Sequence, residues 1–343
     1  MKILIVGGGL IGRERLLGLE KISKNYSLKF QTTVVDTDES ILTNLKEDFD
    51  INISTSFTEE AVQNPDWIFI CTPHSVAPDL AIESFKYSKN IVVEKPLGRN
   101  LKECQKILKA KPDDVNLNVG LNYRFYLGIN ALLNHARKNL FGDIISVNMI
   151  IGHGNSPGME NSWKLQPEIS GGGALIDPGV HLLDLAILVA DSKLTVKGGH
   201  SWKGFWKTGI EEEVHLILES DNKIIFNIQS SLNRWRSNFK LEINGTKGYG
   251  IVTGRGRSYG DQTYITGRRW AWQSGEMQAD TETNQIENYT ADDSFYECMI
   301  GLFKLPSWKI SDSEIYPCDH QSGEEVMKLL EACRKELNID DSC

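Results

Sequence analysis

The feature that most constrains the fold is the start of the chain, where the apolar run KILIV at residues 2–6 leads directly into GGGLIG at residues 7–12. Three of these glycines form the pattern G-x-G-x-x-G between a predicted strand and a predicted helix. The first permits a tight turn, the second lets the backbone approach a pyrophosphate, and the third lets helix and strand pack closely. The amides that open the helix then face the phosphates. The predicted cofactor-binding residues of this loop are Gly7, Gly9, Leu10, Ile11 and Gly12.

A carboxylate follows the second apolar run, in which Thr33 to Val35 lead into Asp36. An acid at this place accepts hydrogen bonds from the adenosine ribose hydroxyls and repels a 2′-phosphate. The next residues, 37–39, are Thr, Asp and Glu, with no arginine among them. We therefore expect NAD as the cofactor, with NADP less favoured. The alternative interpretation is that Asp36 only caps the following helix.

The alternation of short apolar runs with helical patterns over the first 120 residues or so predicts a doubly wound parallel sheet. After Asn122 the pattern changes to strands separated by turn residues, such as Asn244-Gly245, and this predicts an α+β domain with an open, mostly antiparallel sheet and flanking helices. We expect a dinucleotide-binding domain at residues 1–122 and a substrate-binding and oligomerisation domain at residues 123–343.

Composition excludes several function classes. The 343 residues carry a net charge of −9, which argues against nucleic acid or an anionic membrane as the partner. No apolar run approaches the roughly 20 residues of a membrane span. The six cysteines are scattered without CxxC pairs, so we expect reduced thiols, a cytoplasmic location and no metal site. The first residues are interpreted as part of the fold rather than as a signal peptide.

Lys95 lies in the segment VVEKPLG, directly after an apolar run that predicts a strand. Ligands of open α/β sheets bind at the carboxyl ends of the strands, so Lys95 is placed where a substrate would bind. A lysine beside a nicotinamide is suited to general acid–base chemistry. The alternative is a solvated lysine at a strand end.

A second constellation lies in GGGALIDPGVHLLD, residues 171–184. Asp177 and His181 are four residues apart and share one face of a predicted helix. Together they are suited to binding a hydroxyl-rich substrate through hydrogen bonds. Asp184 is placed to accept a hydrogen bond from the second ring nitrogen of His181. Two alternatives remain open: Asp177 as a helix N-cap, and a histidine–aspartate pair that satisfies itself inside a core.

Taken together, these motifs resemble the Gfo/Idh/MocA family, named for glucose-fructose oxidoreductase, inositol dehydrogenase and rhizopine catabolism. The resemblance spans nearly the whole chain, and it rests on GGGLIG, CTP at 71–73, EKP at 94–96, GLNYRF at 120–125 and the stretch 171–184. It implies a Rossmann domain followed by an open-sheet domain, and a dimer or tetramer formed through that sheet.

The resemblance also implies roles for individual residues. Lys95, Asp177 and His181 correspond to the catalytic set. The residues expected to contact the cofactor beyond the glycine loop are Thr72, Pro73, His74, Glu94, Lys95 and Asn122. The residues expected to bind substrate are Arg124, Trp163, Asp177 and His181. The chain departs from the common family pattern at His74, where many members have asparagine, at Pro78, where many have histidine, and at Asp191, where many have glycine.

The expected reaction moves a hydride between nicotinamide and a carbinol or ketone of a sugar-like substrate, with Lys95 or His181 taking the proton and Asp177 orienting the pair. One stretch, residues 254–273, reverses the overall charge with four arginines interleaved with aromatic rings. Arginine forks suit phosphate and aromatic faces suit sugars, so this stretch favours an anionic substrate such as a nucleotide-linked sugar or a sugar acid. A sheet edge or a subunit contact would also explain it.

Three functions therefore compete: a dehydrogenase or ketoreductase of nucleotide-linked sugars or sugar acids, a dehydrogenase of free sugars or inositols, and a cofactor-bound regulatory protein without turnover. The presence of Lys95, Asp177 and His181 together argues against the third, because a non-catalytic protein need not keep them.

Overall fold

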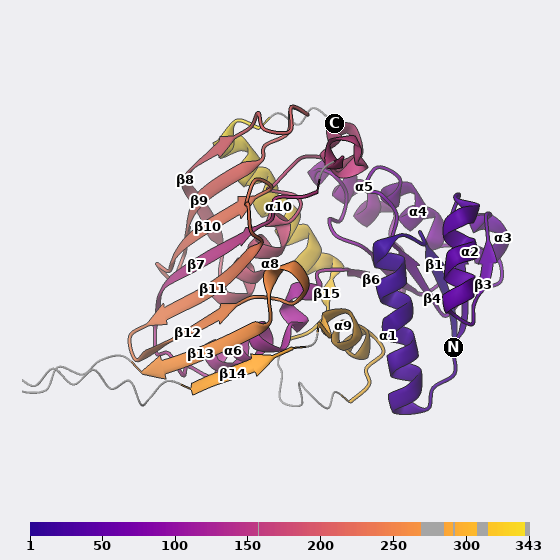
Figure 1. Ribbon diagram of the computed structural model, residues 1–343, viewed down its shortest axis with the longest axis horizontal. Coiled ribbons are helices and arrows are strands. Elements are labelled where there is room, and N and C mark those ends of the chain that lie inside the picture. Colours follow the sequence, from indigo (N-terminus) through magenta and orange to yellow (C-terminus); the bar gives the residue numbers. More distant parts are fainter. Residues whose placement is uncertain (157, 269–284, 291, 307–314, 340–343) are drawn as a thin grey trace, which may run out of the picture.

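The computed structural model describes residues 1–156, 158–268, 285–290, 292–306 and 315–339. The chain forms two sheets that lie apart, with helices between them and around the first (Figure 1). Six of the seven strands of the first sheet come from the N-terminal third of the chain, and the strands of the second sheet come from residues after 143. The two sheet types expected from the sequence, one parallel and one mostly antiparallel, are both present.

The first sheet has seven strands in the order β15-β6-β5-β4-β1-β2-β3, and its first six strands along the chain are parallel. Its strands are apolar because helices cover both faces, and Ile5, Ile68 and Val93 are completely buried. The elements in chain order are β1 (Lys2–Val6), α1 (Leu10–Tyr26), β2 (Gln31–Val35), α2 (Glu39–Asp48), β3 (Asn52–Ser54), α3 (Phe57–Ala61), β4 (Trp67–Ile70), α4 (Ala77–Ser84), β5 (Asn90–Val93), α5 (Leu101–Ala110) and β6 (Asn116–Val119).

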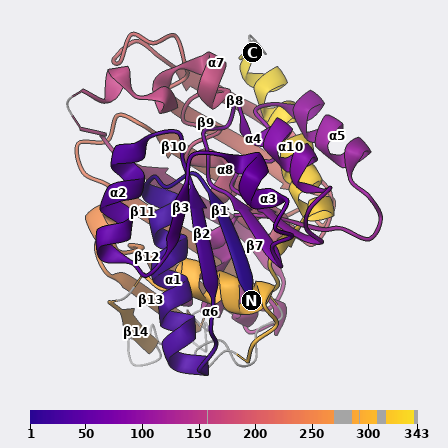
Figure 2. The same ribbon diagram turned by 90° about the vertical axis from the view of Figure 1, so that its right-hand side faces the viewer.

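The order of the strands reverses between β1 and β4, because β2 and β3 continue to one side of β1 while β4, β5 and β6 continue to the other. At such a switch point the loops after neighbouring strands diverge and leave a crevice at the carboxyl ends. The glycine loop follows β1 and Thr72 lies just beyond the end of β4. The topology thus places the predicted cofactor residues at one crevice, and Figure 2 shows β1, β2 and β3 side by side.

The second sheet has eight strands in the order β14-β13-β12-β11-β7-β10-β9-β8. Its pairs are antiparallel except for β7 with β10, which run parallel. Alternation along β10 buries Phe226 and Ile228 against α8, whereas Ile225 stays 46% exposed. The strands are β7 (Ile144–Gly152), β8 (Leu194–Trp202), β9 (Glu213–Ser220), β10 (Ile225–Ser231), β11 (Asn238–Gly245), β12 (Gly248–Thr253), β13 (Gln262–Arg268) and β14 (Gln285–Tyr289).

Helices lie on the face of the second sheet that is turned toward the first domain (Figure 1). The helical segments of this half are η1 (Asn122–Phe125), α6 (Leu127–Arg137), η2 (Met159–Asn161), η3 (Trp163–Leu165), α7 (Pro167–Ser170), α8 (Gly179–Ala190), η4 (Arg257–Tyr259), α9 (Ser294–Leu302) and α10 (His320–Leu337). Helix α8 is apolar all round, and its completely buried residues include Leu182, Leu183 and Leu185. A helix of that kind must lie between layers, and α8 therefore fixes the position of the residues at its own start.

The last part of the chain returns to the first domain. The short strand β15 (Cys318–Asp319) pairs antiparallel with β6, and α10 then packs beside α5 (Figure 2). Helix α9 likewise packs against α1. A single cut after residue 122 therefore does not separate the two sheets, because an edge strand of the first sheet comes from residues 318–319. The sequence contains no clear signal for this edge strand, because it is only two residues long.

Candidate active site

The glycine loop has the geometry that a dinucleotide requires. Gly7 adopts a φ of 98°, and a Cβ on it would lie 2.6 Å from the carbonyl oxygen of Cys71. A Cβ on Gly12 would lie 2.1 Å from the carbonyl oxygen of Gly7, so only glycine allows this approach of helix to strand. A Cβ on Gly9 would instead meet nothing within 4 Å. Gly9 therefore faces open space at the start of α1, where a phosphate group would lie; Leu10, the first residue of that helix, is 61% exposed.

Two more polar groups at this crevice fit the adenosine and nicotinamide ends of a dinucleotide. Asp36 accepts hydrogen bonds from the backbone amides of Gly8 (2.7 Å) and Asp38 (3.0 Å), so its carboxylate is held at the end of β2 beside the glycine loop. The cap of α2 is Asp38, which corrects the alternative that Asp36 is that cap. The hydroxyl of Thr72 is buried and has no hydrogen-bond partner among the described residues. An unpaired buried hydroxyl is costly, and a bound cofactor would supply its partner.

Glu94 forms an ion pair with Arg15. The guanidinium of Arg15, completely buried, donates to one oxygen of Glu94 from Nε (3.0 Å) and Nη2 (2.6 Å). The rings of Phe69 and Phe295 lie 5.4 and 5.0 Å from its Cζ. Arg15 comes from α1, so the pair ties the helix of the glycine loop to the strand end that carries Lys95. The sequence analysis did not identify Arg15.

Lys95 and Asp177 come from different domains and meet directly. Lys95 Nζ donates to Asp177 Oδ1 at 2.6 Å, and Lys164 Nζ lies 3.1 Å from Asp177 Oδ2. Only 16% of the Lys95 side chain is exposed, so the alternative of a solvated lysine is wrong. Burial alone would raise the pKa of Asp177, but the charges of Lys164 and Lys95 hold it well below its usual range. Asp177 is therefore a carboxylate at neutral pH, and its charge raises the pKa of Lys164.

The start of α8 explains why Asp177 is available. The helix begins at Gly179 after Pro178, and no side chain caps it, so the alternative of Asp177 as an N-cap is wrong. His181 lies on the first turn and is 4% exposed. Its ring stacks on Tyr123, with centroids 3.7 Å apart and planes at 9°. Burial and the charge of Lys95 lower the pKa of His181 well below its usual value, so the ring is neutral.

The Nδ1 atom of His181 is buried and has no hydrogen-bond partner among the described residues. The expected contact with Asp184 is wrong, because that carboxylate binds Arg124 instead: Nε donates at 3.0 Å, and Nη2 also donates. The pair is buried, at 4% and 0% exposure, and Arg124 also donates to the carbonyl of Tyr316. Arg124 thus joins η1 to α8, and its expected contact with the substrate stays a prediction.

Asn122 also makes a buried contact within the protein. Its amide nitrogen donates to the hydroxyl of Ser294 at 2.8 Å, and its side chain is buried at 4% exposure. The two residues join η1 to α9, and the expected contact of Asn122 with the cofactor stays a prediction. The motif at 120–125 also contributes Tyr123 to the site, as the ring on which His181 stacks.

His74 and Trp163 close one side of the site. Their rings meet edge to face with centroids 4.9 Å apart, and His74 Nδ1 lies 2.7 Å from the carbonyl oxygen of Ser170, to which it donates. His74 is buried, at 7% exposure. Burial and the charge of Lys95 lower its pKa to about 4. Pro73 lies between Thr72 and His74 and ends the segment after β4.

The stretch at 254–273 divides into parts with different roles. Arg255 lies over the ring of Tyr259 at 3.9 Å and within 5.0 Å of the Tyr123 centroid, so it borders the site. Arg257 instead pairs with Glu14 of α1. Tyr264 is buried beside His135, and Arg268 is exposed at the end of β13. Arg269, Trp270 and Trp272 lie outside the described residues.

Sequence reasoning missed Lys164 and Tyr123 as members of the site, and it flagged Arg255 and Tyr259 only as part of a longer stretch. Lys164 had a signal, because it directly follows the predicted substrate residue Trp163. Tyr123 had one in the GLNYRF motif. The positions of Arg255 and Tyr259 depend on the path of the loop between β12 and β13, which the pattern of residue types does not give.

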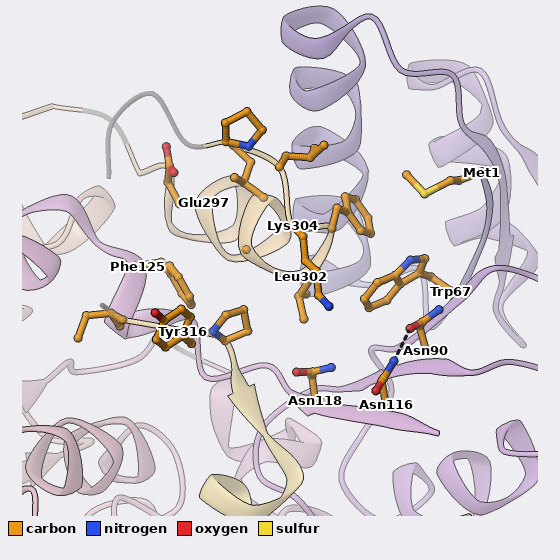
Figure 3. A pocket seen from close by; sticks show the side chains of 17 residues that line it. Met1, Trp67, Asn90, Asn116, Asn118, Phe125, Glu297, Leu302, Lys304 and Tyr316 are labelled. Carbon is orange, nitrogen blue, oxygen red and sulfur yellow. Dashed lines mark hydrogen bonds between the residues drawn. The ribbon is translucent and has the colours of Figure 1, made fainter. Parts of the chain in front are cut away.

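A separate cavity of about 830 Å³ lies at the other end of the first sheet (Figure 3). It is lined by Trp67, Asn90 and Asn116, with α9 and Tyr316 on its far side, and the amides of Asn116 and Asn90 are hydrogen-bonded at 3.1 Å. Asn90 and Asn116 are the first residues of β5 and β6. The cavity is therefore at the amino ends of the strands, away from the crevice at which ligands of such sheets bind.

No group of three or more His, Cys, Asp or Glu residues in the described part of the chain is arranged to hold a metal ion. Among the same residues, no helix is both long enough and apolar enough to cross a membrane.

Comparisons with known proteins agree with this geometry. The levoglucosan dehydrogenase of Pseudarthrobacter phenanthrenivorans is 23% identical in sequence to this chain over 283 residues, which cover 72% of each of the two chains. A solved levoglucosan dehydrogenase in complex with NADH and levoglucosan matches with a TM-score of 0.80 at 17% identity, over 98% of this chain and 97% of the other. The WlbA dehydrogenase from Bordetella pertussis, solved with NADH and UDP-GlcNAcA, matches with a TM-score of 0.78 at 16% identity, over 99% and 96%.

Two family models match in succession. Residues 1–120 match the oxidoreductase family with an NAD-binding Rossmann fold, and residues 131–250 match the GFO/IDH/MocA C-terminal domain. The two matches cover the glycine loop, the Lys95 strand end and the helix that follows Asp177. The chain belongs to the Gfo/Idh/MocA family of NAD-binding oxidoreductases.

Proposed function

We propose that this protein is an NAD-dependent dehydrogenase or ketoreductase that interconverts a ring carbinol and a ketone of a sugar-like substrate, with Lys95 as the proton donor and acceptor. The observation that carries the proposal is the 2.6 Å contact between Lys95 and Asp177 across the two domains. Beside it lies the neutral ring of His181, whose Nδ1 has no hydrogen-bond partner among the described residues. The names of relatives, which include sugar and nucleotide-sugar dehydrogenases, support the substrate class.

The nicotinamide, when bound, accepts a hydride from the carbinol carbon or returns one to the ketone. Lys95 is next to the carboxyl end of β5. Its ammonium form gives a proton to the substrate oxygen in reduction, and its neutral amine form takes the proton from that oxygen in oxidation. Asp177 fixes the direction of the Lys95 side chain and neutralises part of its charge. His181 offers Nδ1 to a substrate hydroxyl, and the stacked ring of Tyr123 prevents the imidazole from rotating away.

The cofactor preference is part of the proposal. A 2′-phosphate would meet the carboxylate of Asp36, which is already fixed by two backbone amides, and Asp38 and Glu39 follow it. The negative charges of the phosphate and of the Asp36 carboxylate would repel each other, and this repulsion disfavours NADP. Thr72, Glu94 and the glycine loop would hold the cofactor from the first domain.

We further propose that the outer face of the second sheet forms a dimer or tetramer interface. Ile217 and Ile225 expose 48% and 46% of their surface on neighbouring strands. Apolar side chains gathered on a sheet face are typical of a covered surface.

A cytoplasmic location is proposed from the five described cysteines, all of which are free.

The proposal is tested without prior choice of a substrate. The protein is incubated with NADH that carries deuterium at C4 and with a protein-free extract of cellular metabolites, and the extract is then surveyed by mass spectrometry. Deuterium should appear on carbon in a sugar-like compound, faster with NADH than with labelled NADPH. Labelling confined to compounds of another class, or no transfer above that of heat-denatured protein, would contradict the proposal and favour a regulatory protein without turnover.

A further inference from the structure

The candidate site has an unusual charge balance for a chain whose net charge is −9. Lys95 and Lys164 both contact one carboxylate, that of Asp177, so this group alone leaves an excess positive charge. Burial lowers the pKa values of the site histidines His74 and His181, so neither contributes charge at neutral pH. The excess therefore comes entirely from the lysines and from the arginine that lies next to them.

Arg255 is that arginine. Its guanidinium lies against Tyr259 at 3.9 Å and against Tyr123 at 5.0 Å, and Nη1 donates to the hydroxyl of Tyr126 at 3.0 Å. It thus contacts aromatic rings and a phenol, and no carboxylate in the described part of the chain pairs with it. Asp292 is separated from Arg255 by the Tyr126 hydroxyl, which donates to it at 3.2 Å, and lies 3.7 Å from Arg257 Nε.

Two ring or guanidinium nitrogens at this place are buried without partners. Arg255 Nε has no hydrogen-bond partner among the described residues, and His181 Nδ1 is in the same state. Tyr123 connects these groups, because it contacts both His181 and Arg255. A buried polar group without a partner is costly, so two such groups on either side of one ring indicate that a ligand with polar oxygens completes the site.

We propose that Arg255 and Lys164 form a subsite for a carboxylate carried by the substrate itself, so that this oxidoreductase acts on a sugar acid rather than on a neutral sugar or an inositol. The planar guanidinium matches a carboxylate through two parallel hydrogen bonds. The rings of Tyr123 and Tyr259 hold the guanidinium in place and exclude water from its faces. This inference rests on the proposed function and names the substrate class of the same site.

The location of the cations favours a carboxylate over the diphosphate of a nucleotide-linked sugar. Lys164 contacts the same aspartate as Lys95, and the substrate oxygen that exchanges its proton must lie beside Lys95. An anion held by Lys164 therefore belongs to the ring that reacts. A nucleotide diphosphate is attached outside that ring and would extend away from Asp177.

The test compares affinities for matched pairs of ligands in the presence of saturating NADH, measured by isothermal titration calorimetry. The pairs are glucose with glucuronate, galactose with galacturonate, and mannose with mannuronate; UDP is measured separately. In the unmodified protein at least one acid should bind about tenfold or more tightly than its neutral partner, because hydrogen bonds to a charged group are the stronger kind.

The variants Arg255→Gln and Lys164→Gln should each reduce that ratio to about threefold or less, and raised salt should reduce it as well. Arg257→Gln is the matched control, since it lies two residues away in the same loop and pairs with Glu14, and it should leave the ratio within about twofold. Because Arg255→Gln removes a packed side chain, Lys164→Gln, whose side chain is 42% exposed, keeps the test valid if the first variant does not fold.

Three results would overturn the inference: no acid binds better than its neutral partner in any pair, the preference survives both variants, or UDP alone is bound. Loss of the inference leaves the proposed function standing if deuterium is still transferred to a neutral sugar. Failure of NADH itself to bind would instead remove the proposed function.

Discussion

The buried pair formed by Arg15 and Glu94 gives the sharpest prediction about stability. Arg15 is completely buried, and 12% of the Glu94 side chain is exposed. Removing one partner of a buried pair costs about 3–5 kcal/mol, because the other charge is left without compensation. Arg15→Met should therefore lower the free energy of unfolding by about 3–5 kcal/mol, a large part of the roughly 5–15 kcal/mol typical of a folded domain.

The assay is urea unfolding followed by far-ultraviolet circular dichroism, applied to a double-mutant cycle of Arg15→Met and Glu94→Gln. The double variant should lose less than the sum of the two single losses, by about 2 kcal/mol. The matched control is Arg13→Met in the same helix, because Arg13 pairs with Asp48 at 2.7 Å but both side chains are about half exposed, at 43% and 51%. That change should cost no more than about 1 kcal/mol. Additive losses in the cycle, or equal losses for Arg13 and Arg15, would refute the reasoning.

Further predictions concern the cofactor loop and the site histidine. The pKa of His74 is lowered to about 4 in the folded protein, so its contribution to stability is full above pH 6.5 and is lost as the pH falls toward 4. From pH 7 to pH 5 the free energy of unfolding should fall by about 2 kcal/mol through this group, and in urea unfolding the His74→Gln variant should show a correspondingly smaller fall. The same pH dependence in both proteins would argue against this role of His74. Gly12→Ala, with its Cβ directed at the Gly7 carbonyl, should lower both the melting temperature and the affinity for NADH. Gly9→Ala should weaken NADH binding about tenfold or more without lowering the melting temperature of the free protein. Fluorescence titration measures the affinity of each variant, and thermal unfolding measures its melting temperature. Asp36→Ser should narrow the preference for NADH over NADPH about tenfold, and a preference unchanged in steady-state kinetics would remove Asp36 from the cofactor site.

Much of the fold could be predicted because its strands have simple patterns. The buried parallel strands are continuous apolar runs, such as KILIV before the glycine loop, and turn residues such as Asn244-Gly245 do lie at the end of a strand of the second sheet. Strand β3 was missed because it is three residues long and none of its side chains is fully buried. Strand β8 was missed because its nine residues are partly or fully exposed in alternation and include two glycines.

The site was predictable where motif and backbone coincide. Lys95, Asp177 and His181 are each within a few residues of a strand end or a helix start, and the two charged residues do meet. The packing contacts of Arg124 and Asn122 were not predicted, because a polar residue in a family motif can also serve packing and only the fold reveals that Arg124 faces Asp184. Lys164 and Arg255 come from loops whose paths depend on contacts between distant segments.

The most direct test of the central claim is the effect of Lys95→Met on turnover and on cofactor binding, measured on the substrate that the deuterium survey identifies. The matched control is Lys106→Met, because Lys106 also contacts an aspartate, Asp79, at 2.7 Å but with both side chains largely exposed. We predict that Lys95→Met lowers kcat by about 10²-fold or more while the Kd for NADH, read from its fluorescence, changes little. Lys106→Met should change neither. A Lys95→Met enzyme with kcat near that of the unmodified protein would contradict the assignment of Lys95 as the proton donor and acceptor.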